Sequence, residues 1–142
     1  MAERRWQPGD PVDWDRPGEL WTAGGLHSFV VESVGARTGR TRRAVLGYLE
    51  DGPDAWLVIG SKGGAPRNPA WVHNLEGEPD ATVVLADGTR LPVRAERLTG
   101  ADLDRAWGRI ADEAPEYVAY RSRTKREIPV IRLRADRGAD PS

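Results

Sequence analysis

Cysteine is absent from this 142-residue sequence, and histidine occurs only as His27 and His73. Disulfides, thiolate metal sites and cysteine nucleophiles are therefore excluded, and we predict no metal site. No apolar run approaches the roughly 20 residues that a membrane-spanning helix needs. The first residues also lack the apolar stretch of a secretory signal. We therefore expect a cytoplasmic protein with no integral membrane segment.

A strong excess of charge of either sign is also missing, because the formal net charge is -1 at pH 7. This balance argues against a nucleic-acid partner. The positive charge is nevertheless concentrated in two segments, which contain Arg37, Arg40, Arg42 and Arg43 in the first and Arg121, Arg123, Lys125 and Arg126 in the second. The length of the chain predicts one domain with a substantial core.

The segment Ser61–Leu75 joins a basic, glycine-rich loop to the start of a helix. Gly63 and Gly64 allow the backbone to approach a ligand closely, and Lys62 and Arg67 supply positive charge. No acidic residue interrupts the segment. These properties favour the binding of an anion, such as a phosphate or a cofactor that carries one.

The helix start in this segment is predicted from Asn68 and Pro69. Asparagine is a preferred N-cap and proline is favoured at the first helical position. A helix that begins here would direct free N–H groups and its positive dipole end toward the loop. The pattern therefore strengthens the interpretation as an anion site.

Alternating apolar residues and turn signals predict a mainly β fold of the α+β class. We expect strands over 29–34, 43–49, 55–59, 81–85, 90–98 and 128–133, the fourth and fifth joined by an Asp87-Gly88 hairpin turn. Short helical segments are expected over 69–77 and 116–123, with a longer helix between Thr99 and Pro115. Six strands with few helices indicate an antiparallel barrel with helices packed outside it.

The two ends of the chain are predicted to differ from this barrel. Residues 1–25 form an irregular arm that contains Trp6, Trp14 and Trp21, and residues 26–134 form the domain. Three large aromatic side chains are unusual in a disordered tail, so parts of the arm should lie against the domain or cover its ligand. Residues 135–142 are expected to form a frayed tail.

Three segments, 34–42, 61–75 and 117–130, together carry a resemblance to a known family. In order and spacing they resemble the deazaflavin-dependent nitroreductase family of split β-barrel flavin/deazaflavin oxidoreductases. The most specific match is the block from Ser61-Lys62-Gly63-Gly64 to Trp71-x-x-Asn74-Leu75. The resemblance implies a six-stranded antiparallel split β-barrel with peripheral helices.

The resemblance also implies that coenzyme F420 is the cofactor and lies in a groove opened by the loop and the first hairpin. The implied cofactor-binding residues are Ser61, Lys62, Gly63, Gly64, Ala65, Arg67, Asn68, Pro69 and Trp71, with Arg42 at the phosphate. Arginine suits this role because its planar fork can grip a phosphate with two charge-assisted bonds. Arg40, and with it Arg43, would extend the positive surface toward the polyglutamate tail.

By the same resemblance, the reduced deazaflavin delivers hydride to a small-molecule acceptor such as a quinone, an enone or a nitro compound. The accompanying proton would come from solvent or from a tyrosine. Tyr120 and Tyr117 match the family's substrate-side tyrosines, with Tyr120 favoured, and Ser61 could hydrogen-bond near the reacting ring. We therefore predict an F420H2-dependent oxidoreductase.

Several alternatives stay open at this point. Related split barrels bind FMN, and a non-catalytic binder of deazaflavin or fatty acid would need no turnover. Lys62 and Arg67 could be solvated surface charges, and Trp71 could be a packing residue of its helix. The tyrosines could also be structural, and His73 is expected to be a surface or packing residue. Family barrels occur as a monomer or homodimer.

The sequence departs from the family pattern in the first hairpin. Ala44 and Val45 stand where relatives commonly have asparagine and proline, Gly47 replaces a frequent bulky aromatic, and Thr41 replaces a usual proline. We expect these positions to lie on the pocket side of the hairpin. They therefore bear on the identity of the acceptor more than on the cofactor.

Overall fold

The structure, a computed structural model, describes residues 10–20, 25–61 and 66–135. These residues form six strands, β1 (Ser28–Val34), β2 (Thr41–Glu50), β3 (Ala55–Ile59), β4 (Asp80–Val84), β5 (Arg90–Arg97) and β6 (Val130–Ala135). They also form three helices, α1 (Ala70–Gly77), α2 (Gly100–Glu113) and α3 (Glu116–Ser122). None of these helices is long and apolar enough to cross a membrane.

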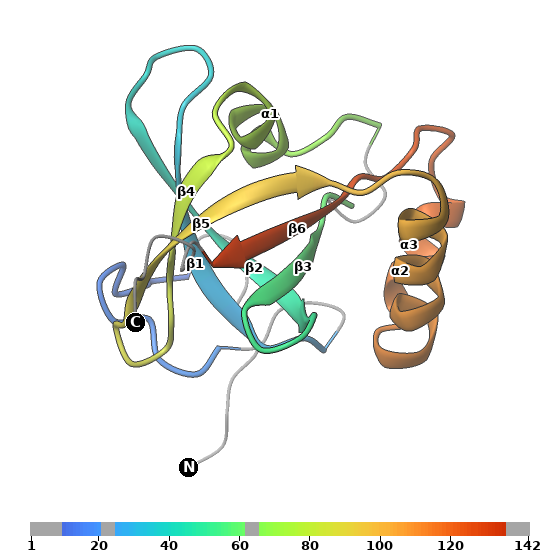
Figure 1. Ribbon diagram of the computed structural model, residues 1–142, viewed down its shortest axis with the longest axis horizontal. Helices are drawn as coiled ribbons and strands as arrows, with labels where there is room; N and C mark the ends of the chain where they lie inside the picture. The colour runs from blue at the N-terminus through green and yellow to red at the C-terminus, as the bar shows by residue number, and fades with distance from the viewer. Residues whose placement is uncertain (1–9, 21–24, 62–65, 136–142) are drawn as a thin grey trace, which may run out of the picture.

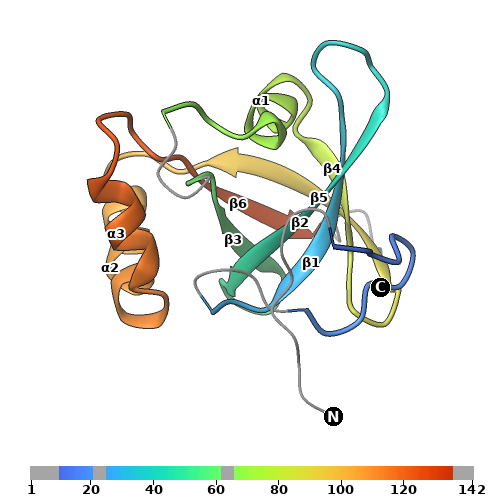
Figure 2. The same cartoon turned by 180° about the vertical axis from the view of Figure 1, so that it is seen from behind.

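The strands close into an antiparallel barrel in the order β1-β2-β3-β6-β5-β4 (Figure 1). The register of β1 and β2 places Ser33 opposite Arg42 and Val34 opposite Thr41. The hairpin that they form extends beyond the rest of the barrel, and α1 lies beside it in both ribbon views (Figure 2). The predicted six-stranded antiparallel barrel with peripheral helices is confirmed.

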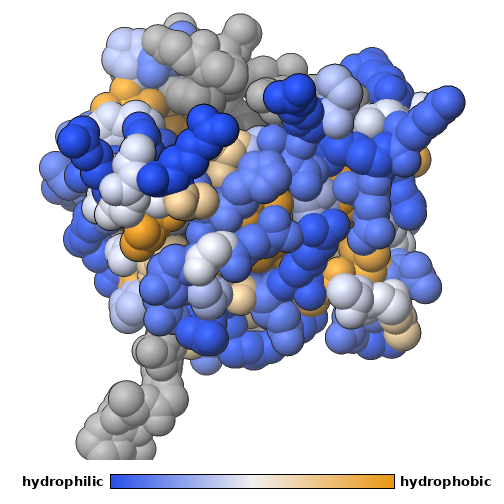
Figure 3. Space-filling view, turned by 90° about the horizontal axis from the view of Figure 1, so that it is seen from above, coloured by the Kyte–Doolittle hydropathy of each residue, from blue (hydrophilic) through white to orange (hydrophobic). Residues whose placement is uncertain are grey.

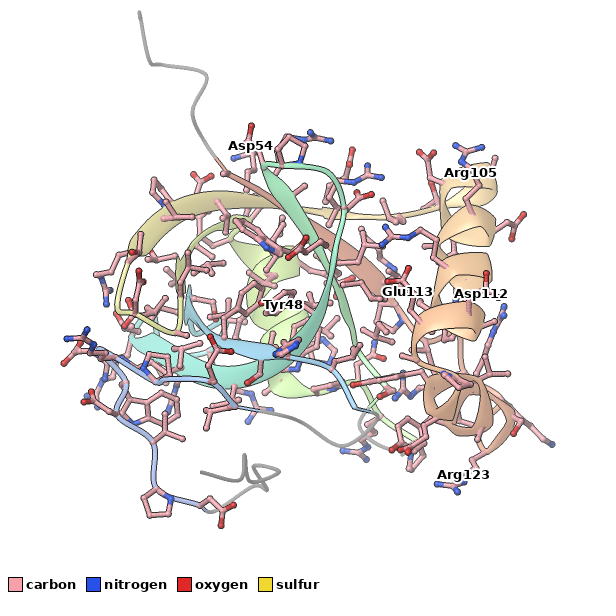
Figure 4. The ribbon with its side chains drawn as sticks, turned by 90° about the horizontal axis from the view of Figure 1, so that it is seen from below. Tyr48, Asp54, Arg105, Asp112, Glu113 and Arg123 are labelled. Atoms are coloured by element: carbon pink, nitrogen blue, oxygen red, sulfur yellow. The ribbon has the colours of Figure 1, made fainter. Side chains whose placement is uncertain are left out.

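The barrel is filled by alternate side chains of its strands and closed at both ends. Phe29, with neighbours from every strand, forms a buried interior cluster, and Val72 and Leu75 of α1 join it at one end. At the other end Tyr48 stacks on Phe29, with ring centroids 4.5 Å apart. Figure 4 shows Tyr48 within the ring of strands. Because its interior is packed, the barrel leaves its ligand site to the surface.

The helices α2 and α3 pack side by side against the outside of the barrel (Figures 1 and 2). Trp107 and Ile110 of α2 and Tyr117 of α3 form a second buried cluster with outward-facing residues of the strands, including Leu57 and Val130. The helix α2 has its apolar residues three and four positions apart, which places them on one face. This cluster fixes α3 relative to the barrel.

The described part of the N-terminal arm, residues 10–20, contains no helix or strand and lies against the barrel. The Gly18 N–H donates to the Ala86 carbonyl at 2.9 Å, and the Leu20 carbonyl accepts from the Ser28 N–H at 3.1 Å. Trp14 is half-buried, as expected for an arm that packs on the domain. Trp6 and Trp21 lie outside the described residues.

One local prediction, the cap of α1, is wrong. The N-cap of α1 is Pro69, and no side chain caps the helix. The Oδ1 atom of Asn68 instead accepts a hydrogen bond from Nη1 of Arg126 at 2.5 Å. A guanidinium from a distant segment therefore outcompetes the helix N–H groups for this oxygen. Thr99 does occupy the N-cap of α2, again without a side-chain cap bond.

Candidate functional site

A cleft with a volume of about 360 Å³ lies between the β1–β2 hairpin and α1. Its lining residues are Ser33, Gly35, Ala36, Arg37, Thr38, Arg42, Arg43 and Ala44 from the hairpin and Ala70, Trp71 and Asn74 from α1. Figure 3 looks down on the face that carries the hairpin tip and α1, which is mostly hydrophilic with small apolar areas recessed between polar side chains.

The hairpin wall of the cleft is shaped by a tight turn. The Gly35 N–H donates to the Arg40 carbonyl and the Gly39 N–H donates to the Gly35 carbonyl, both at 2.8 Å. Gly39 has a φ of +70°, a conformation that glycine adopts without steric cost. A Cβ on Gly35 would lie 3.0 Å from Oγ1 of Thr38. The turn therefore holds the backbone of residues 35–40 in one compact arrangement.

Asn74 joins the two walls of the cleft. Its Oδ1 atom accepts a hydrogen bond at 2.9 Å from the backbone N–H of Ala36, in the hairpin turn. The residue is only 8% exposed, although it lines the cleft. Because the backbone N–H of Ala36 can bond only to the oxygen of the Asn74 side chain, this contact also fixes the orientation of that side chain and leaves its NH2 group to the cleft.

Two buried polar groups in the cleft have no protein partner among the described residues. They are the Asn74 NH2 group and the hydroxyl of Ser33, which is 5% exposed. Buried polar side chains are nearly always hydrogen-bonded, because an unpaired group loses its hydration without compensation. A ligand or water must therefore satisfy these donors, and both groups suit an oxygen acceptor.

The cations around the cleft differ in whether an acidic side chain neutralises them. Nε of Arg43 lies 2.9 Å from Oε2 of Glu32, and Arg90 pairs with the same carboxylate. Arg37 and Arg42 also line the cleft but make no ion pair within the described part of the chain. Their charge is available to a ligand, whereas that of Arg43 is largely compensated. Arg43 is thus a weaker candidate than the sequence suggested.

Trp71 has both of the roles that the sequence left open. It is half-buried, packs against the barrel-interior cluster and lines the cleft. Leu75, on the same helix, is fully a core residue. His73 is exposed, with Nδ1 4.0 Å from Oε1 of Glu76, as expected for a surface histidine.

The altered hairpin positions divide between the cleft and the barrel. Ala44 is half-buried and lines the cleft. Val45 and Gly47 do not line it, and their strand partners are Val30 and Ser28. Of Ala44, Val45 and Gly47, only Ala44 therefore lines the cleft, as we expected for the positions that depart from the family pattern.

The glycine-rich loop is described only at its two ends. Lys62, Gly63, Gly64 and Ala65, predicted to bind the cofactor, lie outside the described residues. Ser61 is 4% exposed, and its carbonyl accepts a hydrogen bond from Nη2 of Arg126 at 2.8 Å. At the other end Arg67 is exposed and Pro69 is half-buried. Arg40 is exposed on the hairpin and is not among the cleft-lining residues.

The two candidate catalytic tyrosines lie on α3, away from the cleft lining. Tyr117 is buried in the outer cluster, and Tyr120 packs against that cluster with its ring edge-on to Tyr117 at 5.3 Å. The Tyr120 hydroxyl lies 3.3 Å from Oε2 of Glu116. Both have structural contacts, and only Tyr120 keeps a half-exposed side chain. Its catalytic role stays a prediction.

Sequence reasoning missed three residues of this region, Ser33, Asn74 and Arg126, as site residues. Asn74 was part of the Trp-x-x-Asn-Leu block, and its polar side chain between the buried Val72 and Leu75 was the available signal. Ser33 and Arg126 gave no comparable signal. Their positions follow from strand register and from contacts across more than 50 residues.

These donors and cations define what the cleft can hold. Two exposed arginines of the cleft have no acidic partner in the described residues, and two buried donors have no protein partner there. Both features suit the acidic end of a ligand better than an apolar molecule. A phosphate-bearing cofactor therefore fits the residues present, and a fatty acid alone would leave several donors unused.

Solved structures identify the fold class. The chain matches a structure described as an F420-H2 dependent reductase with a TM-score of 0.66 and 28% identity, over 75% of this chain and 92% of that one. It also matches the heme storage protein HutZ from Vibrio cholerae with a TM-score of 0.59 and 12% identity, over 78% and 82% of the two chains, a likeness of fold alone. The protein is thus a split-barrel protein of the oxidoreductase type.

Sequence relatives narrow this class. An F420H(2)-dependent quinone reductase of Mycobacterium tuberculosis is 39% identical over 109 residues, which cover 75% of this chain and 72% of that protein. The family model for F420H(2)-dependent quinone reductases matches residues 16–134. The chain belongs to the F420H(2)-dependent quinone reductase family. This confirms the interpretation as an F420H2-dependent oxidoreductase, with coenzyme F420 as the family's cofactor, over the FMN and sequestering alternatives.

Proposed function

We propose that the chain reduces quinones with F420H2 and that the cleft between the β1–β2 hairpin and α1 holds the acidic end of the cofactor. The observation that carries this assignment is the pair of buried donors on Ser33 and Asn74, which lack protein partners in the described part of the chain and lie beside Arg42. The bound phosphate would supply the missing acceptors.

Each wall of the cleft would contribute differently to binding. Arg42, opposite Ser33 in the strand register, can grip a phosphate oxygen pair with its planar fork. Asn74 can donate from α1 while its Oδ1 keeps the turn in place. Trp71 offers an aromatic surface at the same wall. Lys62, Gly63, Gly64 and Ala65 remain proposed cofactor contacts on the family resemblance.

The chemistry of the reaction needs little from protein side chains. Bound F420H2 supplies a hydride, and a quinone that accepts one hydride and one proton becomes the hydroquinone. The side chains must hold the acceptor in place and provide or admit the proton. We propose Tyr120 as the group that orients the acceptor and donates this proton, because its side chain is half-exposed and its hydroxyl lies beside Glu116. Tyr117 would support it by packing.

The acceptor is a small molecule, and quinones are the class proposed here. Relatives bear the name quinone reductase, which supports this class. An enone or a nitro compound stays a candidate. One matching structure, at 28% identity, is described as a domain-swapped dimer, and we propose a monomer or homodimer for this chain.

Anaerobic binding and turnover would test the proposal. The purified protein is titrated with F420 and separately with FMN, and cofactor fluorescence gives both dissociation constants. F420H2 is then offered with a panel of quinones, enones and nitro compounds, and its oxidation is followed by absorbance. Tighter binding of F420 and fastest turnover with a quinone would support the proposal. Tighter binding of FMN, or F420 binding without turnover of any quinone, would contradict it.

A further inference from the structure

Arg126 contacts both ends of the glycine-rich loop with one side chain. Nη2 donates to the Ser61 carbonyl at 2.8 Å, and Nη1 donates to Oδ1 of Asn68 at 2.5 Å. The two acceptors are seven positions apart in the sequence and flank the loop. Arg126 itself comes from the connection between α3 and β6, about 60 positions further along the chain.

The surroundings of Arg126 make these contacts specific. The side chain is partly buried, and burial lowers the pKa of its guanidinium from the ordinary value. The planar fork of an arginine can donate to two oxygens at a fixed spacing, so the geometry of both bonds holds the side chain in place. Three residues further on, the Pro129 carbonyl accepts from the Gly60 N–H at 2.8 Å. The 126–129 connection therefore braces the start of the loop at two adjacent points.

The packing around Gly60 is tight as well. A Cβ on Gly60 would lie 2.8 Å from Pro129 Cγ and from Val72 Cγ2, so neither neighbour leaves room for a side chain. Gly60 and Ser61 thus follow β3 against the 126–129 connection, and Asn68, just before α1, is held by the same connection through Arg126. The same connection follows α3 and its tyrosines directly.

We propose that Arg126 is a positioning residue for cofactor binding: it fixes the spacing of Ser61 and Asn68, and so holds the start of α1, whose residues line the cleft, against the connection that follows α3. The proposal rests on the proposed function, in which the cleft beside α1 holds the acidic end of F420. Arg126 acts through the loop ends and need not touch the cofactor. Lysine would not replace it, since a single ammonium lacks the fork that spans the two acceptors.

Three variants test this role. Arg126→Ala removes the contacts to Ser61 and Asn68, Arg126→Lys retains the charge without the fork, and Lys125→Ala removes an adjacent exposed cation as a matched control. We expect Arg126→Ala to raise the F420 dissociation constant about tenfold or more, as for the loss of charged hydrogen bonds. Arg126→Lys should recover only part of this loss, and Lys125→Ala should bind within twofold of the unmodified protein.

A double-mutant cycle with Asn68→Ala separates positioning from general support of the fold. If Arg126 acts through Asn68, the double variant loses less affinity than the product of the two single losses. A purely structural role would lower the melting temperature but leave the F420 affinity of the folded protein unchanged. Should Arg126→Ala not fold, the cycle is run with Arg126→Lys.

The outcomes also separate this proposal from the one on which it rests. F420 affinity within twofold of the unmodified protein in folded Arg126→Ala and Arg126→Lys would overturn the positioning role alone. Multiplicative losses in the cycle would overturn action through Asn68. Failure of the unmodified protein to bind F420 would overturn the proposed function itself.

Discussion

The backbone N–H of Ala36 donates to Oδ1 of Asn74 at 2.9 Å and so connects a hairpin turn to a helix 38 positions away in the sequence. One consequence is structural, because the bond holds the two walls of the cleft together. The other is chemical, because the bond commits the oxygen of the side chain and leaves its NH2 group to the cleft. We expect the binding of the cofactor's acidic end to depend on that division.

Asn74→Asp separates the two consequences. The aspartate keeps an acceptor for Ala36 N–H but replaces the donor by a negatively charged oxygen. We expect F420 affinity to fall by about tenfold or more, since like charges in a partly buried site repel. Part of the loss should be recovered at acidic pH as the carboxylate is protonated. Fluorescence titration between about pH 4 and 8, a range that reaches the ordinary pKa of an aspartate, measures this, with the exposed His73→Asn as the control.

Arg42 and Arg43 are neighbours on β2 with different surroundings. Arg42→Ala should weaken F420 binding by about 1–3 kcal/mol, the scale for a charged hydrogen bond. Arg43→Ala should have a smaller effect, because the charge of Arg43 is compensated by Glu32. Titrations at low and high salt compare the two variants, and binding by Arg42→Ala should be the less sensitive to salt. Equal effects of both substitutions would argue against a special role for Arg42.

Tyr120→Phe removes the hydroxyl and keeps the ring packing against Tyr117. If this hydroxyl donates the proton, kcat for quinone reduction should fall about tenfold or more. The dissociation constant of F420 should change little, since Tyr120 does not line the cleft. Steady-state kinetics with Tyr117→Phe as the comparison provides the measurement. An unchanged kcat would leave Tyr120 as a structural residue.

Gly60 and Gly108 form a matched pair for stability. A Cβ on Gly60 would clash with Pro129 and Val72, so Gly60→Ala should destabilise the fold by about 1–3 kcal/mol. Gly108 lies within α2, where an added Cβ would meet no neighbouring atom within 4 Å, so Gly108→Ala should stabilise by about 0.5–1 kcal/mol. Urea unfolding of both variants measures the two free energies. A stabilised Gly60→Ala would contradict the packing described for the loop.

Most of the barrel followed from local patterns. The Asp87-Gly88 turn is an example, because Gly88 has a φ of +90° and joins β4 to β5 as predicted. The strand over 55–59 was also predicted with its observed bounds. Such features depend on neighbouring residues, so alternation and turn chemistry are sufficient to find them.

The details of the site depended on contacts that no local pattern contains. Asn68 has the sequence of an N-cap, yet its oxygen accepts from Arg126, which lies 58 positions away. The sequence does not show that Glu32 pairs with Arg43 and leaves the neighbouring Arg42 without an acidic partner among the described residues. Family resemblance predicted the segments of the candidate site, whereas the register of the hairpin and the placement of α1 decide which side chains line the cleft.

The central claim is that the cleft holds the acidic end of F420, and a comparison of two ligands tests it most directly. The dissociation constants of F420 and of the same deazaflavin without its phosphate and glutamates are measured for the unmodified protein and for Arg42→Ala. We predict that F420 binds the unmodified protein much more tightly than the truncated deazaflavin does, and that Arg42→Ala removes most of this difference. If Arg42→Ala weakens the binding of both ligands equally, or of neither, the claim is contradicted.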